Sequence, residues 1–231
     1  MAHSPRWLSA LSNAMDKESK SIVFQLATID DHQPRVRSCI LRETLTAPKY
    51  PITRPLLLTT TDIRTPKVSQ MKSNPQVEAV FWTESTQEQF RIAGRGLLFP
   101  SSDDTKEKCQ ADLSALMGAG HHDPHFDWEA KRISVFNSLG SHMRAAWARP
   151  PPGTLLSNPT EDPKAWPQRV KKVGEAETDQ EKRDVEFALE NFALLMIEPA
   201  EVDWVELGPD PQRRTNASWL GDGWEERAVV P

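Results

Sequence analysis

The segment Leu56–Trp82, LLLTTTDIRTPKVSQMKSNPQVEAVFW, decides the fold. Its first part, with Pro55–Thr60, predicts a strand because it is short, apolar and ends in β-branched residues. Thr65–Ser73 follows with helical character and is stopped by Asn74-Pro75. Val77–Thr83 then predicts the next strand. A strand, a short helix and a second strand therefore follow one another within 30 residues.

The residues on either side of this segment predict more strands. Upstream, Ser21–Ile29 and Arg35–Arg42 are rich in β-branched and apolar residues and predict a hairpin around a polar turn. Residues 43–54 carry two prolines and predict a loop. Downstream, Gln89–Leu98 predicts a further strand. Four or five closely spaced strands with one short helix favour a small barrel over a parallel sheet.

The rest of the chain is less regular. The spacing of apolar residues predicts helices near Trp7–Lys17, over 101–118 and within Trp128–Trp147. The composition predicts a Pro-rich connection over 149–168 and a charged, solvated stretch over Lys172–Asp184. Strands are predicted over Val185–Ile197 and Val202–Leu207. We expect a single domain over residues 1–231. Its core is 21–98, its helical and Pro-rich segment is 101–184, and its closing strands lie in 185–231.

Composition excludes several classes of protein. The chain has 231 residues and a net charge of −5, and a protein that coats nucleic acid is usually basic. Cys39 and Cys109 have neither CxxC spacing nor nearby metal ligands, which predicts reduced thiols. No apolar run approaches the ~20 residues of a membrane span, and the first seven residues do not resemble a signal peptide. We therefore expect a cytoplasmic protein.

The strongest candidate site is a set of groups that suit a phosphate. Arg37 and Arg42 lie on one predicted strand, Thr59–Thr61 end the next, and Arg64, Thr65 and Lys67 follow at a helix start with Pro66 in its first turn and Thr65 as a candidate cap. Arginine supplies paired donors for a phosphate, and a helix N-terminus adds N–H groups and a favourable dipole. Arg37 and Arg42 are five residues apart, so a regular strand points them to opposite faces. Either a bulge intervenes or they serve different parts of a ligand.

Basic residues at strand ends usually do no more than face the solvent. The order of the predicted elements favours a binding site over that interpretation. The succession FQLATID (24–30), PRVRSCILRE (34–43), Leu56–Trp82 and EQFRIAG (88–94) resembles the pyridoxamine 5'-phosphate oxidase-like family. The resemblance covers residues 21–98 in order. It implies a mainly β (α+β) split β-barrel with peripheral helices, which binds FMN at a homodimer interface.

The resemblance also implies a role for individual residues. Arg37 matches a strand arginine that reaches the FMN phosphate, and Arg42 matches a basic position near the ring and the substrate. Thr60 and Thr61 match a strand end that binds the phosphate or the ribityl chain, and Thr65 and Lys67 match further phosphate contacts. Gln89 matches the glutamine that hydrogen-bonds the flavin ring. Gly140 and Ser141 match another contact pair less securely.

The C-terminal tail departs from the family. Its substrate signature, Arg-x-His followed two residues later by arginine, is replaced by Arg213-Arg214-Thr215-Asn216-Ala217, in which only Arg213 remains as a candidate substrate or phosphate contact. A ring-packing tryptophan is replaced by Val205. We therefore expect an FMN-dependent oxidoreductase acting on a small molecule, with no nucleophilic or acid–base residue assigned. Pyridoxamine phosphate oxidation and reduction of another small organic acceptor both stay open.

Three alternatives remain beside this interpretation. A binding protein could hold a flavin or haem on the same barrel without turnover. A nucleic-acid-binding barrel is disfavoured by the net charge of −5 and the single tyrosine. The histidines of Gly120–His125 invite a metal site, but without HxxxH spacing a polar surface loop is the better interpretation.

Overall fold

The computed structural model describes residues 4–17, 22–50, 52–101, 104–116, 126–156 and 162–231. Its elements in chain order are α1 (Arg6–Lys17), β1 (Val23–Asp30), β2 (Gln33–Ile40), β3 (Glu43–Leu45), β4 (Leu56–Asp62), α2 (Pro66–Ser73), β5 (Gln76–Thr83), β6 (Glu88–Phe99), α3 (Asp104–Ala115), α4 (Trp128–Ser138), α5 (Ser141–Ala145), α6 (Asp179–Asn191), β7 (Phe192–Glu206), β8 (Arg213–Trp219) and β9 (Trp224–Val229). Short 3-10 turns at Ala146–Ala148 and Pro163–Ala165 complete the described elements.

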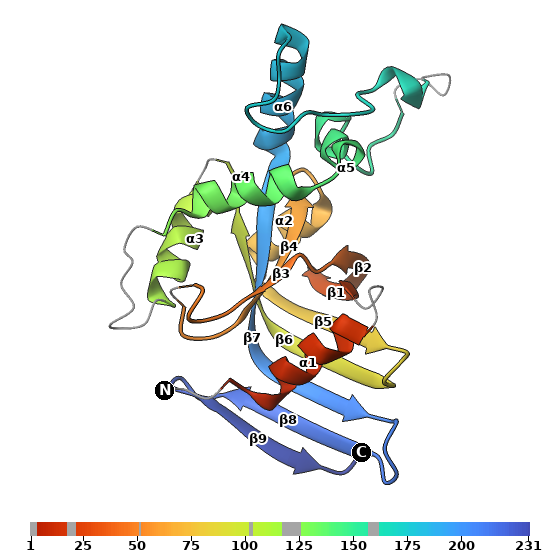
Figure 1. The fold of residues 1–231 in the computed structure, drawn as a ribbon, viewed down its shortest axis with the longest axis vertical. Coiled ribbons are helices and arrows are strands. Elements are labelled where there is room, and N and C mark those ends of the chain that lie inside the picture. The colour runs from red at the N-terminus through yellow and green to blue at the C-terminus, as the bar shows by residue number, and fades with distance from the viewer. Residues whose placement is uncertain (1–3, 18–21, 51, 102–103, 117–125, 157–161) are drawn as a thin grey trace.

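One antiparallel sheet runs through the molecule (Figure 1). Its strands follow the order β2-β1-β5-β6-β7-β4-β3, and β8 and β9 extend it from β7. The sheet is not a closed barrel. Its two arms approach each other just after β2, where the backbone N–H of Arg42 donates to the carbonyl of Leu58 at 2.7 Å. The mainly β split-barrel prediction with peripheral helices is confirmed.

The strand β7 joins the two halves of the structure. Its first half pairs with β4 and its second half with β8, while β6 pairs with it along the other edge. Both faces of its first half are buried. Leu194 and Met196 belong to a core under α3, α4 and α6, whereas Leu195 and Ile197 belong to a core under α1. This period-two alternation explains why the strand is continuously apolar.

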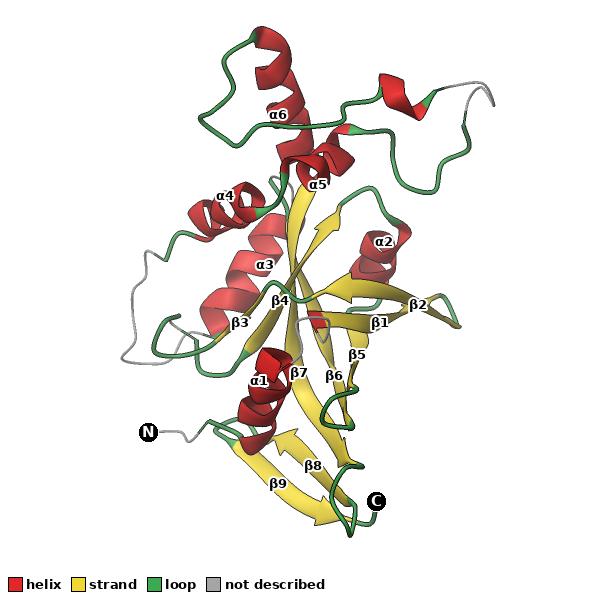
Figure 2. Ribbon diagram, turned by 45° about the vertical axis from the view of Figure 1, so that its right-hand side comes forward, coloured by secondary structure: helices red, strands yellow, loops and turns green. Residues whose placement is uncertain are grey.

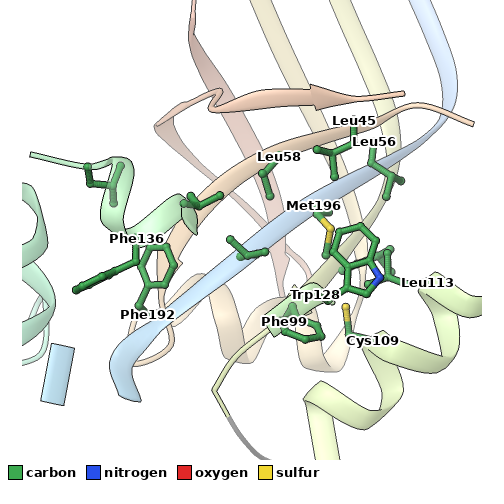
Figure 3. Packing of buried hydrophobic residues seen from close by; sticks show 14 of the residues in the cluster. Leu45, Leu56, Leu58, Phe99, Cys109, Leu113, Trp128, Phe136, Phe192 and Met196 are labelled. Atoms are coloured by element: carbon green, nitrogen blue, oxygen red, sulfur yellow. The ribbon is translucent and has the colours of Figure 1, made fainter. Parts of the chain in front are cut away.

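Aromatic residues fill the core under α3 and α4. Figure 3 shows the Trp128 indole lying among Met196, Leu113 and Cys109. Phe136 packs edge-to-face on Phe192, with ring centroids 5.3 Å apart. This packing fixes the helical segment on the sheet.

A β-bulge relieves the long β6–β7 pairing. The register shifts between Ala93 and Gly94, opposite Pro199 and Glu201. A Cβ added at Gly94 would lie 2.0 Å from the carbonyl oxygen of Glu198, so only glycine allows this close approach of the two strands.

Four expectations need correction. Residues 43–54 were predicted as loop but include β3, which pairs with β4. Val185–Ile197 was predicted as a strand, but its first seven residues form the end of α6. A capping box between Thr178 and Glu181 starts that helix, and Val185 and Ala188 form its buried face. The helix predicted within Trp128–Trp147 divides at Leu139–Gly140 into α4 and α5. Thr65 occupies the N-cap position of α2, but its side chain makes no capping bond.

Candidate functional site

Two of the predicted phosphate-binding segments meet beside the start of α2. The β1–β2 hairpin lies next to this helix (Figure 2), and β4 leads into it through a three-residue turn. Arg37 comes from β2, Thr61 from the end of β4, and Thr65 and Lys67 from the helix start. We call these four residues the phosphate cluster.

Arg37 is anchored by neutral oxygens. Its Cα pairs with that of buried Leu26 on β1, so its side chain starts on the core side of the hairpin. The guanidinium donates to the carbonyl of Leu26 at 3.1 Å, to Thr28 Oγ1 at 2.6 Å and to Gln70 Oε1 at 3.0 Å. Thr28 and Gln70 are both buried, and the Thr28 hydroxyl donates to the same Gln70 oxygen at 2.7 Å. The arginine is therefore held by β1 and α2 together.

Lys67 is anchored by hydroxyls. Its Nζ lies 3.0 Å from Thr61 Oγ1 and 2.9 Å from Thr65 Oγ1. Instead of capping α2, the Thr65 hydroxyl donates to the carbonyl of Asp62 at 2.7 Å. The end of β4 and the first turn of α2 thus hold the ammonium between two threonines.

The two cations carry little electrostatic compensation. Within the part of the chain that the structure describes, neither Arg37 nor Lys67 forms a salt bridge. Burial lowers the pKa of each below its ordinary value. Burial also raises the pKa of Cys39, which faces both cations as a free thiol. Two partly desolvated positive charges that contact only neutral groups form a ready site for an anion.

Arg42 does not join the phosphate cluster. It lies beyond the end of β2, and its Nη2 donates to the Met143 sulfur at 2.9 Å. Burial lowers its pKa. Met143 belongs to α5, whose N-terminus carries Gly140 and Ser141. Arg37 and Arg42 therefore point to different places, as the five-residue spacing predicted.

Two neighbouring candidates have different surroundings. Arg64 binds both carboxylate oxygens of Asp62 and the carbonyls of Trp147 and Arg149, so it ties the end of β4 to the segment after α5. Thr60 is half-buried between the buried threonines 59 and 61. Arg64 is thus committed to the fold, and Thr60 faces away from the Thr61 side of β4.

Gln89 and Arg213 lie elsewhere on the sheet. A row of cross-strand pairs runs from β2 to β6 through Arg37, Leu26, Ala79 and Ile92, so these side chains share one face of the sheet. Gln89 is three residues from Ile92 on β6 and therefore points to the opposite face. Exposed Arg213 pairs with Glu206, next to the pairing of Gln89 with Val205. Within one chain Gln89 and Arg213 thus lie at the far end of β6–β8, apart from both the phosphate cluster and Arg42.

The sequence pointed to neither Thr28 nor Gln70. Gln70 lies three residues after Lys67, one helical turn along α2. This spacing puts the two side chains on the same face of the helix, which could have indicated Gln70 from the sequence. Thr28 was hidden because it alternates with Phe24 and Leu26 as one more buried strand residue.

Comparison with known proteins agrees with this geometry. Residues 4–100 match the family model described as the FMN-binding domain of pyridoxamine 5'-phosphate oxidase. Over these residues the chain is similar to the pyridoxamine 5'-phosphate oxidase-like family. The match contains the whole phosphate cluster and Gln89.

The likeness to solved structures extends beyond residue 100. A pyridoxamine 5'-phosphate oxidase-related, FMN-binding protein from Nostoc punctiforme is 25% identical, with a TM-score of 0.69 and all of both chains covered. PhzG from Burkholderia lata, solved with tetrahydrophenazine-1-carboxylic acid, is 13% identical with a TM-score of 0.56, over 98% of this chain and 89% of PhzG, and shows the fold alone. The uncharacterized protein YGR017W of Saccharomyces cerevisiae is 22% identical over 97% of this chain and 98% of its own.

Other candidate sites are limited. The histidines of Gly120–His125 lie outside the described residues, apart from which no group of three metal-ligating side chains is found. His142 binds the carbonyl of Gln168 through Nδ1 at 2.8 Å, at the surface of α5. Among the described helices, none is long and apolar enough to cross a membrane.

Proposed function

We propose that this protein binds FMN and that the phosphate cluster holds the FMN phosphate. The observation that carries the proposal is the pairing of Arg37 and Lys67, two partly desolvated cations that contact only neutral oxygens. A phosphate monoester would supply the missing negative charge, while the Thr61 and Thr65 hydroxyls hold the Lys67 ammonium in place. Pro66 removes one N–H from the first turn of α2, so side chains carry most of the recognition.

We infer that the flavin ring lies toward a second copy of the chain. The ring-side candidates Gln89 and Arg213 cannot reach the phosphate cluster of their own chain, since Gln89 is three strands away and on the other face. That face also exposes Val23, Val36 and Trp82, at 41%, 64% and 40%. We call Val23, Val36, Trp82 and Gln89 the outer face. A homodimer that covers the outer face would bury these apolar side chains and bring Gln89 to the partner's cluster.

We further propose an oxidoreductase of the pyridoxamine 5'-phosphate oxidase-like type, acting on a small molecule. FMN supplies the redox chemistry when bound, and the protein binds and orients it. Arg42 would face the substrate side, separated from the phosphate cluster. In the altered tail, Arg214 is committed to Asp203 by two bonds of 2.8 Å, while Arg213 is exposed. This supports a small organic acceptor as an alternative to pyridoxamine phosphate.

We also infer that residues 1–231 form one domain. The two cores share β4, β6 and β7, whose alternate residues enter one core or the other. Neither core can therefore be removed without exposing the strands of the other. Calorimetry should show one cooperative unfolding transition, and two separated transitions would contradict a single domain.

Titration with FMN tests the proposed function. Binding to the purified protein should quench flavin fluorescence, and Arg37→Ala combined with Lys67→Ala should weaken affinity by about 100-fold or more, because two charge-assisted phosphate contacts are lost. Arg35→Ala is the matched control, since Arg35 lies on the same strand, is exposed and pairs with Asp30. A wild-type protein that takes up no FMN, or a double variant with unchanged affinity, contradicts the proposal. Turnover of pyridoxamine phosphate with oxygen, followed as hydrogen peroxide, then decides between the two substrate alternatives.

A further inference from the structure

One buried tryptophan joins the α5 segment to the phosphate cluster. The helical backbone of α5 continues into the 3-10 turn at Ala146–Ala148, which contains Trp147. The indole Nε1 of Trp147 donates to the carbonyl oxygen of Thr61 at 3.1 Å. Thr61 is 3% exposed and Trp147 is 7% exposed, so water has little access to this bond. A residue outside the strands and the helix that form the cluster is therefore in direct contact with it.

The bond acts on the part of the cluster that holds Lys67. The Thr61 carbonyl accepts from Trp147, while Thr61 Oγ1 lies 3.0 Å from Lys67 Nζ. A lysine side chain is a flexible four-carbon stem, so its ammonium needs fixed partners in order to stay in one place. A shift of the Thr61 backbone would move one of the two threonine hydroxyls that hold the ammonium.

Trp147 is itself held from two sides. Its backbone carbonyl accepts from Asn191 Nδ2 at 3.1 Å and from Arg64 Nη2 at 3.3 Å. Its ring packs edge-to-face on Phe192, with ring centroids 5.0 Å apart. The end of α6, the turn after β4 and the aromatic core therefore determine together where the indole N–H lies.

The same segment also reaches Arg42. Met143 lies four residues before Trp147, one helical turn along the chain, so the two side chains are neighbours on the helical surface. The Met143 sulfur accepts from Arg42 Nη2 at 2.9 Å. The α5 segment thus contacts both the phosphate cluster and the separate position of Arg42.

We propose that Trp147 is a positioning residue for the phosphate cluster. Its indole N–H fixes the Thr61 backbone, and through Thr61 it fixes the Lys67 ammonium where a phosphate binds. This inference rests on the proposed function, because the phosphate is that of FMN. If Trp147 only stabilised the fold, its N–H would affect FMN affinity to the same extent with or without the Lys67 side chain.

A double-mutant cycle between Trp147→Phe and Lys67→Ala tests the proposal on the purified full-length chain. Phenylalanine keeps an aromatic ring and removes the N–H. Measured by flavin fluorescence quenching, Trp147→Phe should weaken FMN binding about fivefold in the wild-type background, the factor of one hydrogen bond, and by less than about twofold in the Lys67→Ala background. An equal factor in both backgrounds overturns this inference alone. A wild-type chain that takes up no FMN overturns the proposed function and this inference with it.

Trp204→Phe is the matched control. Trp204 is also 7% exposed, and its Nε1 donates to Glu88 Oε1 at 3.0 Å, so the substitution removes an equally buried indole N–H that does not contact the cluster. It should leave FMN affinity unaltered. A loss equal to that of Trp147→Phe would show that any buried indole bond has this effect, and would overturn the proposal.

Hydrogen exchange of the Trp147 indole N–H decides if Trp147→Phe does not fold, as judged by circular dichroism. The exchange rate is measured by nuclear magnetic resonance on the ¹⁵N-labelled chain. Saturating FMN should slow this exchange about tenfold in the wild-type chain, because a phosphate that holds Lys67 also holds Thr61 against the indole. In Lys67→Ala saturated with FMN the exchange should not slow. An exchange rate that FMN leaves unchanged in the wild type, or slows equally in both chains, overturns the proposal.

Discussion

The guanidinium of Arg37 donates to the side-chain oxygen of Gln70 at 3.0 Å, which joins a strand cation to a helix amide. Because Gln70 is neutral, it positions Arg37 without cancelling its charge. A carboxylate at the same place would make an ion pair and leave less charge for a phosphate. The neutral partner therefore distinguishes an anion site from a structural salt bridge.

We predict that Gln70→Glu weakens FMN binding by about tenfold or more while the protein stays folded. The two side chains have nearly the same shape, so the bonds from Thr28 and Arg37 can persist. The new charge competes with the phosphate for Arg37. Flavin fluorescence quenching measures the affinity, and thermal unfolding checks the fold. Gln33→Glu, an exposed site on the same strand as Arg37, is the control, and equal affinities for the two variants would show that Gln70 does not act through Arg37.

Three members of the phosphate cluster are close along the chain, and Arg37 comes from a strand that is not adjacent to theirs. Thr61, Thr65 and Lys67 lie within one strand–helix turn, so local geometry brings them together. Gln89, which the resemblance assigns to the flavin ring, lies on another face, and its position depends on strand order and pairing, which are set by contacts distant in sequence. The strand predicted from Val185 was wrong for a local reason. An apolar run fits a helix end as well as a buried strand, and only the cap at Thr178 decides.

Glu43 should stabilise the fold in a pH-dependent way. Its carboxylate accepts bonds from Lys131, Lys49 and the Tyr50 hydroxyl, which clamp the segment around β3 to α4. Although burial opposes the shift, these bonds lower the pKa of Glu43 from 4.5 to about 2. A depressed carboxylate pKa means that the stabilisation is present above pH 4.5 and is lost as the pH falls toward 2.

The variant Glu43→Gln isolates this contribution. At neutral pH it should lower the free energy of unfolding by about 2 kcal/mol, allowing for the partial exposure of the group. The difference from wild type should shrink as the pH falls from 4.5 toward 2. Urea unfolding across that interval measures it, and a difference that does not change with pH would mean that the charge of Glu43 is not responsible.

Gly94 should not tolerate a side chain. The Cβ of an alanine there would collide with the Glu198 carbonyl, which is backbone and cannot rotate away. We expect Gly94→Ala to lower the free energy of unfolding by about 2 kcal/mol or more, since the bulge between β6 and β7 must open. Gly140→Ala is the control, because nothing lies within 4 Å of its added Cβ and its φ is −65°. Equal stability of the two variants by urea unfolding would show that the bulge adapts freely.

The outer face should mediate self-association. Val36 and Trp82 lie on the face that carries Gln89, and both are exposed in the single chain. We expect the wild-type protein to be a dimer, and Trp82→Glu to weaken it by about 30-fold or more, since truncating an interface tryptophan commonly costs about 2 kcal/mol. Sedimentation equilibrium measures this change. Leu220→Glu is the control, because Leu220 is 63% exposed in the turn between β8 and β9, away from the outer face.

Dimerisation and flavin binding should be coupled. If Gln89 of one copy reaches the phosphate cluster of the other, Trp82→Glu must weaken FMN binding although it leaves Arg37 and Lys67 untouched. FMN should in turn strengthen the dimer by the same factor, because linkage between two binding equilibria is reciprocal. Titrating FMN into Trp82→Glu and Leu220→Glu at one protein concentration tests both statements. A monomeric Trp82→Glu variant that binds FMN as tightly as wild type would show that one chain holds the whole flavin site, and would contradict the shared arrangement.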